Sequence, residues 1–219
     1  ILKKFQTKFN LNDKPIVVAD RGKLNNDNIA YLENNNYKYI LAAKIKNISN
    51  DLKEQISNLA FLDDGTIHTL AIDKEIKYKD ADGVKHTIQV KQRLVLTYSS
   101  KRAKKDKYTR DKALEKIEAK LAKSITKSDL KLSYYAKYLD IDEKCDIKYK
   151  LNPSKILNDE KLDGIKGYIT NDFTLNANDV IQHYQNQYDV EKAFRISKTD
   201  LKIRPIYHRL ETRIKAHIW

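Results

Sequence analysis

Two separated carboxylates are the residues of this sequence best suited to chemistry. Asp20 follows a short apolar run, and Glu191 lies far along the chain. Three cations flank the second carboxylate: Lys192, Arg195 and Lys198. Two carboxylates on a rigid scaffold can hold hard divalent cations such as Mg²⁺ or Mn²⁺. A pair of such ions can activate a water or a sugar hydroxyl in phosphodiester transfer, and the cations would then contact phosphates.

A row of polar side chains surrounds Glu191. If the segment is a helix that turns about 100° per residue, four polar residues share an arc of roughly 60°. They are Tyr184, Gln187, Glu191 and Lys198. An apolar stripe that should face a core borders this arc and is formed by Val190, Phe194 and Leu201. Because a surface helix ordinarily turns its charges away from its core stripe, this row indicates a polar partner.

Each carboxylate also has a structural interpretation. An Asp after an apolar strand is commonly a turn residue or a helix cap. Glu191 could form an ion pair with Arg195, which lies one helical turn further on. Position in the sequence does not decide between these roles and catalysis.

The composition favours a polyanionic partner in a reducing compartment. Lys and Arg number 43 against 30 acidic residues, so the formal net charge is +13. Nucleic acid is the commonest partner of such a chain, and a merely soluble basic protein is the alternative. The single cysteine, Cys145, cannot form an internal disulfide, and no apolar run approaches the roughly 18 residues of a membrane span. We therefore expect a cytoplasmic protein.

The elements that would position the first carboxylate form a βαβ unit over residues 10–46. The run 16–19 is apolar throughout, as in a strand buried on both faces, and it is followed by Asp20 and Arg21. A helix is expected over 26–34 and a second strand over 37–43. Open α/β sheets place their ligand chemistry at the carboxyl ends of such strands.

From residue 64 the pattern changes to an antiparallel meander. Short alternating strands are expected on both sides of a turn at 80–83, and a charged helix is expected over 104–123. A strand over 167–170 then precedes the long helix that carries Glu191. That helix begins at Leu175 or Asn176 and ends before Pro205.

The expected organisation therefore has three parts. Residues 1–63 form one part of an α/β core, 64–150 form a β-rich insertion with one charged helix, and 151–219 complete the core with its final strand and the long helix.

The motifs at both ends resemble one family. The run VVADRG at 17–22, the pattern Tyr184-x2-Gln187-x3-Glu191-x6-Lys198 and the run LKIRPIYH at 201–208 are similar to the DDE transposases of bacterial insertion sequences. The resemblance is to the subgroup with a Tyr-x2-Arg-x3-Glu-x6-Lys signature. It implies an RNase H-like core with a β-rich insertion, Mg²⁺ or Mn²⁺ as cofactor, and DNA cleavage and transfer at transposon ends. It also implies a homodimer that associates with the nucleoid.

The resemblance also implies a role for each matching residue. Asp20 corresponds to the second metal-binding Asp, and Glu191 to the metal-binding Glu. The side chains expected to contact DNA are Arg21, Tyr184, Gln187, Arg195 and Lys198. Gln187 replaces the signature Arg, so a phosphate contact there would be weaker.

The first metal-binding Asp of the family has no counterpart in this sequence. Only Asp13 precedes Asp20, and it lies in an expected turn beside Pro15. We therefore expect a C-terminal portion of a transposase that cannot catalyse strand transfer alone. The alternatives are an inactive transposase remnant and an unrelated basic DNA-binding module without catalysis.

Overall fold

The chain contains both helices and strands, and its largest sheet includes a parallel pair, as expected for the α/β class. A computed structural model describes residues 2–20, 25–61, 63–80, 82–121, 137–142, 148–199 and 209–218. The helices are α1 (Leu2–Lys8), α2 (Asn26–Asn34), the 3-10 helix η1 (Ile45–Asn47), α3 (Asn50–Ser57), α4 (Ser100–Leu121), α6 (Pro153–Glu160), α7 (Ala177–Gln185), α8 (Gln187–Thr199) and α9 (Glu211–Ile218). The strands are β1 (Val17–Ala19), β2 (Tyr39–Ala43), β3 (Ile67–Lys79), β4 (Lys85–Tyr98), β5 (Leu139–Asp142), β6 (Lys148–Leu151) and β7 (Ile165–Thr170).

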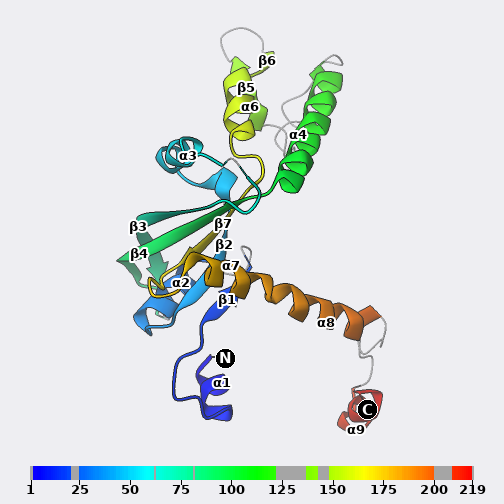
Figure 1. Cartoon of the computed structure of the whole chain (residues 1–219). Helices are drawn as coiled ribbons and strands as arrows, with labels where there is room; N and C mark the ends of the chain where they lie inside the picture. Colours follow the sequence, from blue (N-terminus) through cyan, green and yellow to red (C-terminus); the bar gives the residue numbers. More distant parts are fainter. Residues whose placement is uncertain are drawn as a thin grey trace. The chain divides into compact units, whose positions relative to one another are not determined.

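The largest sheet has five strands in the order β1-β2-β7-β4-β3, and β5 and β6 form a separate pair (Figure 1). Strands β1 and β2 are parallel, with Val17 opposite Tyr39 and Ala19 opposite Leu41. Helix α2 connects them. Its first turn is capped by Asn25, whose side chain accepts a hydrogen bond from the Asn28 backbone N–H at 2.9 Å. The βαβ unit expected over 10–46 is confirmed.

The expected meander is instead one long hairpin. Strands β3 and β4 continue through the positions where breaks were expected, and they join the same sheet as β1, β2 and β7. Ile72, Ile76 and Tyr78 of β3 are buried or half-buried and lie on the same face of the strand, since side chains alternate between faces. The polar residues Asp73 and Lys74 between them do not interrupt this alternation. At the turn, the Asp80 carboxylate accepts from the Val84 backbone N–H at 2.8 Å.

The chain divides into two compact units. Unit 1 comprises Ile1–Ala42, Ala71–Arg93 and Tyr168–Trp219, and unit 2 comprises Ala43–Leu70 and Leu94–Gly167. The three-part division at residues 64 and 151 stays a prediction.

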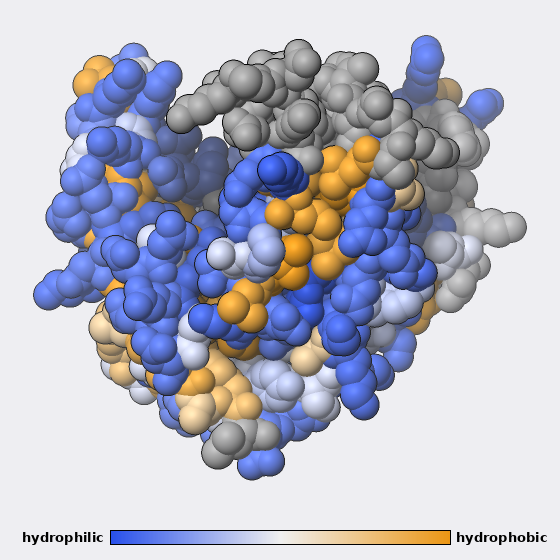
Figure 2. Space-filling view, turned by 90° about the horizontal axis from the view of Figure 1, so that it is seen from above, coloured by the Kyte–Doolittle hydropathy of each residue, from blue (hydrophilic) through white to orange (hydrophobic). Residues whose placement is uncertain are grey.

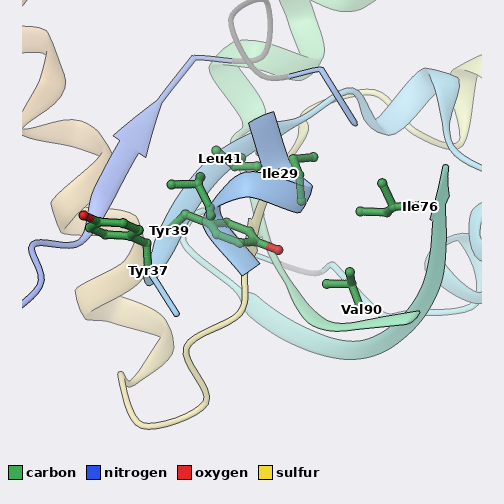
Figure 3. Packing of buried hydrophobic residues seen from close by; sticks show 7 residues of the cluster. Ile29, Tyr37, Tyr39, Leu41, Ile76 and Val90 are labelled. Carbon is green, nitrogen blue, oxygen red and sulfur yellow. The ribbon is translucent and has the colours of Figure 1, made fainter. Parts of the chain in front are cut away.

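The core of unit 1 is built from strand and α2 side chains, which Figure 3 shows in close packing. Its buried members are Ile29, Leu32, Tyr37, Tyr39, Leu41, Ile76 and Val90. The Tyr39 hydroxyl donates to Glu33 Oε1 at 2.6 Å and accepts from Gln92 Nε2 at 2.7 Å. Burial raises the pKa of this phenol well above its ordinary value. A buried polar group is thus satisfied inside an otherwise apolar cluster.

In unit 2, α4 packs its apolar side into a second core. Ala113 and Ile117 of α4 are buried against Tyr138 and Leu139. Arg110, on the same side of α4, is only 4% exposed, and its guanidinium donates to the Asp163 carboxylate. The charged helix expected over 104–123 is therefore α4, anchored by one apolar face and one buried cation.

Hydrophilic residues cover most of the face seen in Figure 2, where they surround a band of apolar residues. In the part of the chain that the structure describes, no helix combines the length and the apolar character needed to cross a membrane.

Candidate functional site

Asp20 meets Tyr184 at the carboxyl end of β1. The Tyr184 hydroxyl donates a hydrogen bond to Asp20 Oδ1 at 3.3 Å, although the two residues lie 164 positions apart in the sequence. Asp20 is exposed and Tyr184 is half-buried. The structure therefore brings together two of the predicted site residues, one from each motif.

Helix α7 carries Tyr184 and contacts β1. The helix begins after Asn176, whose side chain accepts from the Asp179 backbone N–H at 2.8 Å and so caps the helix. Val180 of the same helix is fully buried. The Tyr184 ring packs against the Tyr168 ring of β7, with centroids 5.0 Å apart. These contacts fix the phenol that reaches Asp20.

Sequence reasoning missed the residues that anchor the loop before α7. The Arg93 guanidinium donates to the backbone oxygens of Asp172 at 3.1 Å and Leu175 at 2.6 Å. Asn171 uses its side chain to bond the backbone N–H of Tyr39 at 3.0 Å. Since Asn171 directly follows β7, the strand-end rule that singled out Asp20 could also have found it.

Asp172 strengthens the same loop from within. Its carboxylate accepts from the backbone N–H and the hydroxyl of Thr174, at 2.8 and 2.7 Å. Burial alone would raise the pKa of Asp172, but these hydrogen bonds outweigh it and lower the pKa below its ordinary value. Charge-assisted hydrogen bonds therefore stabilise the loop that precedes α7.

The long helix expected around Glu191 is two helices. Helix α7 ends at Gln185, Asn186 caps it, and α8 begins at Gln187. Asn is a poor helix former because its side chain competes for backbone hydrogen bonds. Asn186 keeps right-handed helical dihedral angles, φ −59° and ψ −21°, so the interruption between Tyr184 and Glu191 is one residue long.

Four predicted site residues lie on α8, which extends away from α7 (Figure 1). Gln187 is half-buried, and Glu191, Arg195 and Lys198 are exposed. Glu191 follows Tyr184 by two turns, about 10 Å of helix rise. The ion pair considered for Glu191 with Arg195 does not form, although both residues are described. Among the described residues, Glu191 thus forms no ion pair, and no contact with Asp20 is shown.

The stripe beside Glu191 does not face a core. Val190 is 54% exposed and Phe194 is 68% exposed, and α8 buries none of its side chains. The expectation of a covered apolar face is therefore wrong for these two residues. Leu201 and the predicted DNA contact Arg21 lie outside the described residues.

One carboxylate of the site suits a hard cation. Asp20 is an exposed carboxylate at a strand end, and the Tyr184 hydroxyl can orient it as an outer-shell donor. Within the described ranges, no group of three or more His, Cys, Asp or Glu side chains could hold a metal ion. A two-carboxylate site formed by Asp20 and Glu191 is smaller than such a group and stays a prediction.

Comparison with known proteins gives no family for the chain. No protein-family model matches it, and a search of curated proteins finds no significant match.

Proposed function

We propose that this chain carries the second-Asp and Glu part of a DDE-type transposase, with an RNase H-like core, acting on DNA with Mg²⁺ or Mn²⁺. The observation that supports this proposal is the hydrogen bond between Tyr184 and Asp20. It joins the VVADRG segment to the helix that begins the Tyr-x2-Gln-x3-Glu-x6-Lys pattern.

In this proposal the residues have distinct tasks. Asp20 supplies carboxylate oxygen from the fixed end of β1, and Tyr184 holds that carboxylate in place. Glu191 supplies the second carboxylate, and Gln187, Arg195 and Lys198 contact the DNA backbone. A bound divalent ion would supply activation of the attacking oxygen and stabilisation of the leaving oxygen.

The reaction would be hydrolysis at the end of a mobile element followed by attack of the freed 3′-hydroxyl on target DNA. The chemistry requires the carboxylates of Glu191 and Asp20 to lie close together, because paired metal ions lie only about 4 Å apart. The proposal places the protein on nucleoid DNA in the bacterial cytoplasm, working as a homodimer.

A non-catalytic basic DNA-binding protein is the second candidate. The net charge of +13 favours it, because DNA affinity needs cations but no carboxylates. The two candidates differ in what they require of Asp20 and Glu191.

The deciding experiment measures Mn²⁺ binding by electron paramagnetic resonance in the presence of duplex DNA. Asp20→Asn and Glu191→Gln should each weaken Mn²⁺ affinity about tenfold or more, since even outer-shell changes cost 10- to 100-fold. Asp189→Asn is the matched control, because Asp189 is an exposed carboxylate on the same helix as Glu191.

Unchanged Mn²⁺ affinity in both variants, with DNA binding intact, would refute the transposase proposal and favour the second candidate. Equal losses in all three variants would show only general attraction of the cation to acidic residues, and would count against a specific site.

A further inference from the structure

Helix α4 has two faces with different roles. Its buried side includes Arg110, Ala113 and Ile117. On the opposite side, the helical repeat places five exposed residues within an arc of about 100°. These residues are Lys101, Lys104, Lys105, Tyr108 and Lys112. We call the first four, Lys101, Lys104, Lys105 and Tyr108, the lysine face, and leave out Lys112 because it pairs with Glu115.

The three lysines of this face are not used in ion pairs. Other cations of α4 have partners: Lys107 pairs with Asp111 at 3.1 Å, and Lys112 pairs with Glu115 at 2.8 Å. In the described part of the chain, Lys101, Lys104 and Lys105 form no ion pair. Asp64 accepts hydrogen bonds from the backbone N–H and the hydroxyl of Ser100, so it caps the helix.

The position of these lysines is unfavourable for α4 itself. The first turn contains no acidic residue, and the positive end of the helix dipole repels cations there. Lys101 also lies three and four residues from Lys104 and Lys105, a spacing at which like charges repel. Asp64, which caps the helix, interacts electrostatically with Lys104. The spacing of Lys101 from Lys104 and Lys105 is still unfavourable for the helix, and an anionic partner would offset that repulsion.

Tyr108 adds a second unexplained feature. Its side chain is 64% exposed in the middle of the basic arc, so core packing does not explain an aromatic residue there. A tyrosine hydroxyl can donate to phosphate oxygen, and such contacts are common in backbone recognition.

We propose that the lysine face binds the phosphate backbone of duplex DNA without regard to sequence. It belongs to unit 2, whereas Asp20 and Tyr184 belong to unit 1, so it is a DNA contact additional to the candidate site. This inference rests on the proposed function in one respect, that the polyanion bound by the lysine face is DNA.

Two other anionic partners fit less well. A helix that lies on a membrane inserts its apolar face, but the apolar face of α4 is buried in the unit 2 core. Proteins that hold single strands stack successive bases on several aromatic side chains, and this face has one. Flexible lysines along a rigid helix suit the regular charge of a duplex.

The test is the salt dependence of duplex binding, measured by fluorescence anisotropy with a random-sequence duplex and a metal chelator. The test variant combines Lys101→Gln, Lys104→Gln and Lys105→Gln. The matched control removes three other exposed lysines, on the β3–β4 hairpin: Lys74→Gln, Lys85→Gln and Lys91→Gln. Glutamine keeps a helix propensity close to that of lysine.

We expect the slope of log affinity against log salt to fall in magnitude by about 2 to 3 in the test variant, since each phosphate contact contributes about 0.9. The control should change it by less than about 1. Tyr108→Phe should weaken binding a few-fold and leave the slope unchanged. The thermal midpoint of the test variant should equal or exceed that of the wild type, because repulsion is relieved.

Equal slope changes in the test and control variants would overturn the proposal, as would an unchanged slope in the test variant. A larger loss for single-stranded DNA or for anionic vesicles than for the duplex would also overturn it. A lowered thermal midpoint would show that the lysines serve the fold. Because the chelator removes divalent ions, the result is independent of Asp20 and Glu191, so the metal site can fail while this inference stands.

Discussion

Replacement of the buried cation of α4 gives the clearest test of the energetics. Arg110 donates to Asp163, and their side chains are 3% and 10% exposed. Removing one partner of a buried ion pair ordinarily costs 3–5 kcal/mol, because the other charge stays buried without compensation. In this case Lys46 also contacts Asp163, at 3.1 Å, so part of the compensation remains.

We therefore expect Arg110→Met to lower the free energy of unfolding by about 3 kcal/mol, the low end of that range. The second partner of Arg110 is Glu160, at 3.5 Å, and its side chain is half exposed. That contact adds little, since exposed pairs contribute about 0–1 kcal/mol. Methionine is chosen because it preserves the aliphatic stem of the arginine and its contacts within the core.

The assay is urea unfolding followed by circular dichroism. Lys107→Met is the matched control, because it also removes one paired cation from α4, but from a pair in which both side chains are exposed. The control should cost about 0.3–0.5 kcal/mol. If Arg110→Met cost less than about 1 kcal/mol, or no more than the control, Arg110 would not anchor the helix as argued.

Three further variants test other contacts. Gly164 has φ +80°, and an added Cβ would lie 2.6 Å from the Tyr98 ring. Gly83 has a similar φ of +81°, but its surroundings are open. Gly164→Ala should therefore lower the urea midpoint of unfolding well below that of Gly83→Ala. Burial would raise the pKa of Asp159, but hydrogen bonds from Lys46, Tyr138 and Lys137 lower it overall. The ionised Asp159 therefore stabilises the fold fully above its ordinary pKa, and this stabilisation is lost as pH falls through the lower pKa of the folded state. Asp159→Asn should thus flatten the decline in stability below about pH 4, measured by unfolding across pH. Tyr184→Phe should weaken Mn²⁺ binding about tenfold if its hydroxyl orients Asp20, with unchanged affinity as the contrary outcome of the same titration.

Local patterns predicted the elements whose signals are strongest. The apolar run before Asp20 and the helical pattern after it predicted a βαβ unit, because each is a clear local pattern of apolar residues. A helix was expected to begin at Leu175 or Asn176; it begins at Ala177, and Asn176 caps it.

The remaining differences arise where neighbouring effects compete. The expected single helix is interrupted at Asn186, where a weak propensity is not overcome by core packing, because α8 buries no side chain. Short strands were expected on both sides of the turn at 80–83, but the inward positions of β3 keep their register along one continuous strand. Neither outcome can be decided from a local pattern, since both depend on what the rest of the chain covers.

The candidate site was predictable only in part for the same reason. The strand-end rule found Asp20, and the motif resemblance suggested Tyr184, which the structure brings to it. Arg93 was missed because one arginine in an alternating strand has no local signal for the distant loop oxygens that it binds. The relation of Glu191 to Asp20 stays a prediction.

The lack of buried side chains on α8 also has a thermodynamic consequence. An isolated helix of this length is marginally stable in water, so α8 gains little free energy from its own backbone hydrogen bonds. Any ligand that fixes Glu191 must then offset the conformational entropy lost when the helix is ordered. Binding and local folding would be coupled, and the apparent affinity for a cofactor alone would be lower than for cofactor and nucleic acid together.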